Sequence, residues 1–157
     1  MLTGSVAMNY YAAPRMTRDI DVVVAIEPKD VDAIMSLFEN DYYIDRNAVL
    51  RAIANQSLFN IIQNESIIKV DCIIRKNTEY RRLEFERREK ANIQDLEVWI
   101  VSKEDLIISK LYWAKDSHSE LQLRDVKNLL AAGYDAKYLE EWSRRLGLHE
   151  LLEEVLP

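Results

Sequence analysis

The chain has 157 residues, of which 48% are hydrophobic and 31% are charged, a balance typical of a soluble globular protein. This length allows one domain with a real core, or a small domain with a helical extension. No apolar run approaches the roughly 20 residues of a membrane span, and no signal peptide is recognisable. The single cysteine, Cys72, fits a reducing cytosol, so we expect a cytoplasmic protein that is not bound to a membrane. The net charge of −6 argues against a protein that coats nucleic acid, although it leaves room for a local basic patch.

Alternating helices and strands are predicted for the first part of the chain. The strand "DIDVVVAI" places Ile20, Val22 and Val24 on one face and Asp19 and Asp21 on the other. The elements expected here are a helix over 5–13, a loop over 15–18, a strand over 19–26, a helix that begins near Pro28 and a helix over 46–55.

A hairpin and then helices are predicted for the rest. The stretch "SLFNIIQNESIIKVDCII" contains two β-rich runs separated by Asn64 and Glu65. A charged segment over 75–91, typical of a solvated helix, leads to a strand over 96–101. Ser102 caps the first of several helices that continue to Leu156, with breaks near Gly133 and Gly147. The sequence therefore predicts an α+β fold: a mixed-sheet core over 1–101, with a helical region over 102–157 packed on it.

Two carboxylates on one face of a valine-rich strand require an explanation. Residues two apart in a strand project to the same side, so Asp19 and Asp21 lie together. At a separation of about 4 Å and an effective dielectric near 20, they would repel by about 4 kcal/mol. A shared proton, an arginine or a divalent cation could neutralise them, and hard oxygen ligands suit Mg²⁺. The simpler alternative is an exposed aspartate that pairs with Arg15 or Arg18.

Two further features favour a site over a surface ion pair. Gly4 and Ser5 precede a short helix, and such a turn offers backbone N–H groups, a helix dipole and a hydroxyl to a phosphate. Asp71 lies within an apolar strand, where a carboxylate is rarely left unpaired. A metal ligand from a neighbouring strand would explain its position. We therefore expect Asp71 to face Asp19 and Asp21.

The segment "GSVAMNYYAAPRMTRDIDVVV", with Asp71 downstream, resembles the nucleotidyltransferase superfamily with the DNA-polymerase-β-type fold. The closer resemblance is to the small bacterial branch that includes the abortive-infection nucleotidyltransferase toxins. That branch carries an "R-x-T-x-D-I-D" run, matched here by Arg15, Thr17, Asp19 and Asp21, and a later helix of the form "DLIxxKL". Members of this branch usually have a helix before the first motif, whereas Met1 lies only two residues before it. One interpretation is that the chain is shortened, and another is that its start is wrongly assigned.

The resemblance implies metal-dependent transfer of a nucleoside monophosphate from a nucleoside triphosphate to an acceptor hydroxyl, with Mg²⁺ or Mn²⁺ as the cofactor. Lys110, on the later helix, would point toward a phosphate or the carboxylates, or would be a lysine whose stem lies on the core. The resemblance implies that Asp19, Asp21 and Asp71 are both the metal ligands and catalytic residues, and that Lys110 is a further catalytic residue. It also implies a set of nucleotide-binding residues: Gly4, Ser5, Arg15, Thr17 and Arg18.

Asp125 is interpreted equally well as a supporting catalytic residue and as an ion-pair partner of Lys110 or Arg124. The charged segment is an ordinary solvated helix or, near an active site, a contact for an RNA backbone. Its arginines in that role would be Arg81, Arg82, Arg87 and Arg88.

The acceptor and the partners stay open at this point. The acceptor would be RNA, in particular tRNA, or a protein, and the setting a toxin–antitoxin or phage-defence system with a cognate toxin or antitoxin protein. The alternative from another class is a non-catalytic domain that keeps the fold and binds a nucleotide or a partner.

Overall fold

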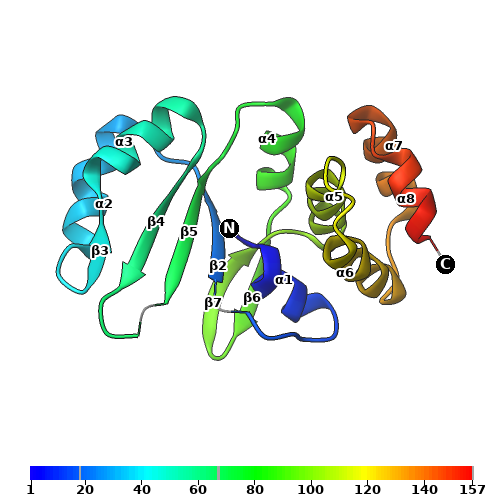
Figure 1. Ribbon diagram of the computed structural model, residues 1–157, viewed down its shortest axis with the longest axis horizontal. Helices are drawn as coiled ribbons and strands as arrows, with labels where there is room; N and C mark the ends of the chain where they lie inside the picture. The colour runs from blue at the N-terminus through cyan, green and yellow to red at the C-terminus, as the bar shows by residue number, and fades with distance from the viewer. Residues whose placement is uncertain (18, 67, 157) are drawn as a thin grey trace.

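A computed structural model describes residues 1–17, 19–66 and 68–156, and within these ranges seven strands form one sheet in the order β3-β4-β5-β2-β1-β7-β6 (Figure 1). The strands are β1 (Leu2–Thr3), β2 (Asp19–Val24), β3 (Tyr42–Ile44), β4 (Leu58–Gln63), β5 (Lys69–Ile74), β6 (Glu89–Ile93) and β7 (Leu96–Ile100). β2 pairs in parallel with β5 and antiparallel with β1, and β1 pairs in parallel with β7. The mixed sheet confirms the predicted α+β class.

The helices divide into a pair near one end of the sheet and a larger group near the other. In Figure 1, α2 and α3 lie beside β3 and β4, whereas α5 to α8 lie at the opposite end. The helical segments are α1 (Gly4–Tyr11), a 3₁₀ turn η1 (Pro28–Asp30), α2 (Val31–Phe38), α3 (Arg46–Asn55), α4 (Glu79–Glu86), α5 (Lys103–Ala114), α6 (Glu120–Ala131), α7 (Ala136–Leu146) and α8 (His149–Val155). No helix in the described ranges has both the length and the apolar surface that crossing a membrane requires.

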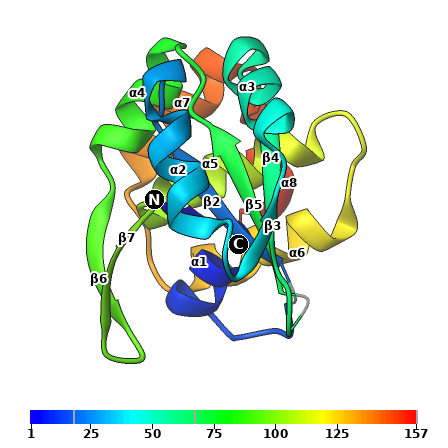
Figure 2. The same cartoon turned by 90° about the vertical axis from the view of Figure 1, so that its left-hand side faces the viewer.

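A small hydrophobic core covers one face of β4 and β5. Phe59 and Ile61 from β4 and Cys72 and Ile74 from β5 are buried, and they pack with α2 and α3. Figure 2 shows these two helices in front of the strands. The opposite face of the same strands carries the alternate residues, which include Asp71. The sheet therefore has a covered apolar face and a polar face on which a site can form.

A larger hydrophobic core joins the N-terminal part of the chain to the C-terminal helices. Met8 of α1 and Ile100 of β7 belong to the same buried cluster as Leu106, Leu129 and Leu139 of the later helices. Helix α5 is buried over most of its length, which is why its sequence lacks a strongly polar face. The C-terminal helices thus pack on the sheet-containing part, while a domain boundary at residue 101 stays a prediction.

Several predicted elements match the structure closely. The helix over 46–55 has the predicted bounds, and the hairpin has its turn between β4 and β5. The interpretation of 75–91 as one solvated helix is wrong, because it forms helix α4 and then strand β6. Strand β6 turns into β7 at Gln94 and Asp95, whose φ angles of 47° and 67° are those of a tight hairpin turn. The C-terminal helices also have a break between α5 and α6 in addition to those near the two glycines.

Candidate active site

The polar face of the central strands brings the three predicted aspartates together. In the parallel pairing of β2 with β5, Asp21 lies opposite Asp71, and Asp19 lies opposite Lys69. Residues in register on paired strands point to the same face, so Asp19, Asp21 and Asp71 share one side of the sheet. Asp71 is mostly buried, with 18% of its side chain exposed, whereas Asp19 is 55% exposed. The expected spatial arrangement is present, and the role of the aspartates as metal ligands stays a prediction.

The turn into helix α1 lies directly against Asp21. Gly4 has a φ angle of +58°, and a Cβ atom placed on it would lie 2.0 Å from Oδ2 of Asp21. Glycine is required here for both the backbone conformation and the close approach. The backbone amide of Ser5, in this turn, lowers the pKa of Asp21. Burial and the charge of Asp71 act more strongly, so the pKa of Asp21 is raised above its ordinary value.

Lys69 and Asn60 hold the carboxylate of Asp71. The Lys69 ammonium lies 3.1 Å from Oδ2 of Asp71 and 3.6 Å from Oδ1 of Asp19, so it bridges the two strands. The side-chain amide of Asn60, which lies opposite Asp71 on β4, donates a hydrogen bond to Oδ1. The hydrogen bond to Asp71 raises the pKa of Lys69, which keeps its ammonium charged.

A second polar cluster connects the start of helix α1 to helices α5 and α6. The Lys110 ammonium is buried and lies 2.7 Å from Oδ2 of Asp125. Arg15 reaches the same carboxylate at 3.3 Å and donates a 2.7 Å hydrogen bond to Oγ of Ser5. Asn9 fixes the loop by hydrogen bonds to the backbone N–H and C=O of Arg15. Two cations share one buried carboxylate here, which leaves an excess of positive charge beside Ser5.

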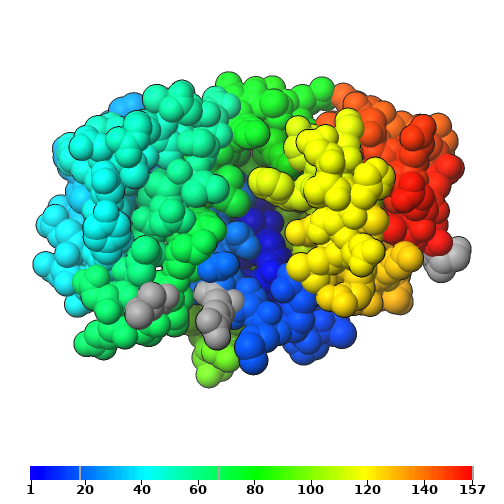
Figure 3. Space-filling view, viewed as in Figure 1, coloured from blue at the N-terminus to red at the C-terminus, as the bar shows by residue number. Residues whose placement is uncertain are grey.

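A cavity of about 190 Å³ lies between the two clusters. Figure 3 shows a hollow at this place, with the N-terminal segment at its bottom and the residues between α5 and α6 along one rim. Ser5, Asp21 and Lys110 line it together with Gly4. The structure thus gathers residues from the first motif and from the later helix around one space, as the resemblance implies.

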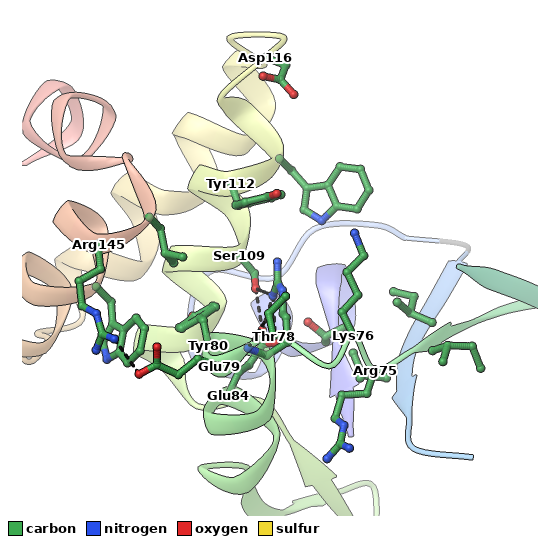
Figure 4. Close-up of a pocket in the computed structure, with 18 residues that line it drawn as sticks. Arg75, Lys76, Thr78, Glu79, Tyr80, Glu84, Ser109, Tyr112, Asp116 and Arg145 are labelled. Carbon is green, nitrogen blue, oxygen red and sulfur yellow. Dashed lines mark hydrogen bonds and ion pairs between the residues drawn. The ribbon is translucent and has the colours of Figure 1, made fainter. Parts of the chain in front are cut away.

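A larger cavity of about 560 Å³ adjoins the first, because Thr3, Ile73, Ser109 and Trp113 line both. Figure 4 shows Ser109 and Tyr112 projecting from α5 on one side and Lys76 from the loop before α4 on the other. Its charged lining residues are largely paired: Glu79 with Arg145, and buried Glu84 with Arg81 and Ser109. The pairs are Arg145–Glu79 at 2.6 Å, Arg81–Glu84 at 2.8 Å and the Ser109–Glu84 hydrogen bond at 2.6 Å.

The four arginines proposed for RNA contact lie in different surroundings. Arg81 is held by Glu84 in the larger cavity, and Arg87 pairs at 3.0 Å with Asp105, which is fully buried. Arg82 contacts the oxygen atoms of Asn77, and Arg88 packs over the rings of Phe85 and Trp99. The segment therefore does not form one continuous basic patch.

Two predicted nucleotide-binding residues remain. The hydroxyl of Thr17 donates to the backbone carbonyl of Asp19 at 3.1 Å, so it supports the beginning of β2. Arg18 lies outside the described residues.

The donor set of the carboxylate face suits a divalent cation, although its side chains do not converge on a shared point. Mg²⁺ and Mn²⁺ prefer carboxylate oxygens, and burial together with the charge of Asp71 raises the pKa of Asp21. Among residues 1–17, 19–66 and 68–156, no group of three acidic, histidine or cysteine side chains is arranged to hold a metal ion. The Lys69 ammonium lies between Asp19 and Asp71, at 3.6 Å and 3.1 Å from their oxygens.

Sequence reasoning missed the residues that surround the carboxylates. Lys69 and Asn60 could have been found from the strand pattern, because Lys69 is two positions from Asp71 and Asn60 is on the partner strand of the hairpin. Asn9 carried no such signal, because its contact with the loop at Arg15 depends on the geometry of the turn after α1.

Comparison with known proteins defines the fold. Neither a protein-family model nor a curated protein sequence matches the chain. Solved structures do match: the lincosamide antibiotic adenylyltransferase LnuA, bound to lincomycin, superposes with a TM-score of 0.54 at 15% identity, over 83% of this chain and 85% of that chain. An antigenic nucleotidyltransferase-like protein from Paracoccidioides brasiliensis gives a TM-score of 0.59 at 14% identity, over 98% and 78% of the two chains. The antibiotic-resistance factor ANT(2'')-Ia gives a TM-score of 0.58 at 15% identity, over 98% of this chain and 86% of that chain.

These likenesses establish that the chain has the nucleotidyltransferase fold. The predicted fold is confirmed, whereas membership of the superfamily and of its abortive-infection branch stays a prediction.

Proposed function

We propose that this protein is a metal-dependent nucleotidyltransferase that moves a nucleoside monophosphate from a nucleoside triphosphate to an acceptor hydroxyl. The observation that carries the proposal is the cavity in which Asp21, in register with Asp71, meets the Gly4–Ser5 turn and Lys110. A surface ion pair would not require a glycine packed against the carboxylate or a buried lysine across the cavity.

In this proposal the acidic residues bind the metal ion and the basic residues bind the phosphates. Asp19, Asp21 and Asp71 would hold Mg²⁺ or Mn²⁺, which when bound supplies positive charge to the phosphates and to the reacting oxygen. The Ser5 turn and Lys110 would bind the outer phosphates, because both line the same cavity, and Arg15 adds a positive charge 2.7 Å from Oγ of Ser5.

The reaction is a displacement at the α-phosphorus. The acceptor hydroxyl oxygen forms a bond to the α-phosphorus and loses its proton to solvent, the bond from that phosphorus to the bridging oxygen of the β-phosphate breaks, and pyrophosphate leaves. Positioning and charge neutralisation supply most of the rate enhancement in such transfers. Arg18, which precedes Asp19 in the sequence, would contribute a further cation, and Thr17 supports the beginning of β2.

The larger cavity is the proposed entry for the acceptor, since it adjoins the carboxylate cavity and has the volume of a small-molecule site. RNA, in particular tRNA, and a protein remain proposed acceptors from the sequence, and a small hydroxyl compound is a further candidate because LnuA was solved with lincomycin. For RNA, Arg82 and Arg88 are the arginines best placed, since Arg81 and Arg87 are engaged with carboxylates. A toxin–antitoxin or phage-defence setting with a cognate partner protein rests on the sequence resemblance.

Labelled nucleotides test the proposal directly. The protein is incubated with Mg²⁺ and each nucleoside triphosphate, labelled at the α- or at the γ-phosphate, with total RNA, cell protein or lincomycin as acceptor. We expect the α-label to appear on an acceptor and the γ-label in pyrophosphate. Asp21→Asn serves as the matched inactive control. Binding of triphosphate without any transfer or pyrophosphate release would instead support the non-catalytic alternative, in which the domain keeps the fold only to bind.

A further inference from the structure

The positively charged side chain of Lys69 lies between two aspartates of the carboxylate face, which is the face of β2 and β5 that carries Asp19, Asp21 and Asp71. Its ammonium lies 3.1 Å from Asp71 and 3.6 Å from Asp19, and these two aspartates are on different strands. The backbone fixes this placement: Lys69 is opposite Asp19 in the parallel pairing and two residues before Asp71 on β5. Its side chain must therefore start from the same face as the carboxylates.

Both oxygens of Asp71 already have a donor. Oδ1 accepts from the Asn60 amide and Oδ2 accepts from the Lys69 ammonium. A cation that binds Asp71 must therefore replace one of the two donors or share an oxygen with it. Asn60 is a short side chain held within the sheet, whereas Lys69 has a long, flexible stem and 38% of its side chain is exposed.

The ion pairs of Lys69 are easy to break. Partly exposed lysine–carboxylate pairs contribute little net stability, because water solvates the separated charges well. A divalent cation carries twice the charge and binds carboxylate oxygens directly, so it competes favourably for the same atoms.

We propose that Lys69 is an internal counter-ion, which stabilises the carboxylate face in the metal-free protein and withdraws from Asp19 and Asp71 when a divalent cation binds. This inference rests on the proposed metal dependence of the site. It makes Lys69 a positioning residue that sets how tightly the metal is held.

The test measures binding of Mn²⁺ alone, without nucleotide, by the electron paramagnetic resonance signal of the free ion. Lys69→Met removes the competing charge, so we expect Mn²⁺ to bind about tenfold more tightly than to the natural protein. Lys69→Arg keeps the charge and should bind Mn²⁺ as the natural protein does. Lys90→Met is the matched control, because it removes the same charge from an exposed pair with Glu97 on the β6–β7 hairpin.

The melting temperature of the metal-free protein gives a second, independent readout. Without Lys69 the carboxylates repel one another, so Lys69→Met should melt at a lower temperature than the natural protein and should gain more from added Mn²⁺. Lys69→Gln replaces it if the methionine variant does not fold.

Three outcomes would overturn the proposal, and they separate it from the proposed function. Equal Mn²⁺ affinity in the natural protein and Lys69→Met would refute the counter-ion role alone. Weaker binding by Lys69→Met would show that Lys69 assists the metal, again without affecting the proposed function. Absence of Mn²⁺ binding by every form would overturn both the counter-ion and the metal dependence.

Discussion

Replacement of Gly4 by alanine tests whether the turn before α1 sets the position of Asp21. The φ angle of +58° costs a residue with a side chain about 1–2 kcal/mol. The new Cβ would also lie 2.0 Å from Oδ2, 2.7 Å from Cγ and 3.0 Å from Cβ of Asp21, so no rotation of the carboxylate alone relieves every contact. Asp21 must move out of its place to relieve this overlap, and such overpacking costs about 1–3 kcal/mol.

Gly133 supplies a matched control for the backbone cost. Its φ angle is +78°, and nothing lies within 4 Å of the Cβ that an alanine would add. Gly133→Ala should therefore lower the free energy of unfolding by about 1–2 kcal/mol, and Gly4→Ala by about 2–5 kcal/mol. Urea denaturation in the presence of a chelator measures both values.

The two variants should also differ in metal binding. Gly133→Ala should keep the rise in melting temperature caused by Mn²⁺ and triphosphate, and Gly4→Ala should lose most of it, because Asp21 is moved. If Gly4→Ala is no less stable than Gly133→Ala and responds equally to Mn²⁺, the turn does not position Asp21 and the reasoning is refuted.

Three further predictions concern stability and charge. Because the pKa of Asp21 is raised above its unfolded value of 3.8, its ionised form costs stability above the folded pKa, and the cost vanishes as the pH falls below the unfolded value. Asp21→Asn should therefore melt at a higher temperature than the natural metal-free protein at pH 7, with a difference that shrinks on acidification; a lower melting temperature at pH 7 would identify a structural ion pair. Lys110→Met should lower the free energy of unfolding by about 3 kcal/mol, since it removes the nearer of the two cations that neutralise buried Asp125 and leaves only Arg15, at 3.3 Å. The double variant with Asp125→Asn should cost less than the sum of the two single changes. If RNA is the acceptor, replacing Arg82 and Arg88 by glutamine should flatten the salt dependence of RNA binding by roughly two units, and an unchanged slope would favour a protein or small-molecule acceptor.

The parts of the fold that the sequence predicts are those with strong local patterns. Alternation in "DIDVVV" determines that Asp19 and Asp21 share a face, and the helix over 46–55 ends where its apolar spacing ends. Strand β1, of two residues, is too short to give any pattern, yet it joins β2 to β7. Strand β6 is rich in charges because only part of it is buried, so its composition resembles a solvated helix.

The candidate site shows the same division. Asp19 and Asp21 alternate along one strand, and Asp71 is a lone carboxylate in an apolar strand. Together with the Gly4–Ser5 turn they match the motif of the nucleotidyltransferase superfamily, so their grouping could be predicted. The pairing of Lys110 with Asp125 was one of two alternatives, because the sequence does not give the angle between α5 and α6. The partners of Asp105, which include Tyr80 and Arg87, lie far from it in sequence and depend on how α4 packs against α5.

A crystal structure with Mn²⁺ and a non-hydrolysable nucleoside triphosphate would test the central claim most directly. We expect an anomalous Mn²⁺ peak at about 2.1 Å from carboxylate oxygens of Asp21 and Asp71, with the outer phosphates at the Ser5 turn and the Lys69 ammonium withdrawn. A triphosphate bound elsewhere on the protein, with no Mn²⁺ at these carboxylates, would contradict it.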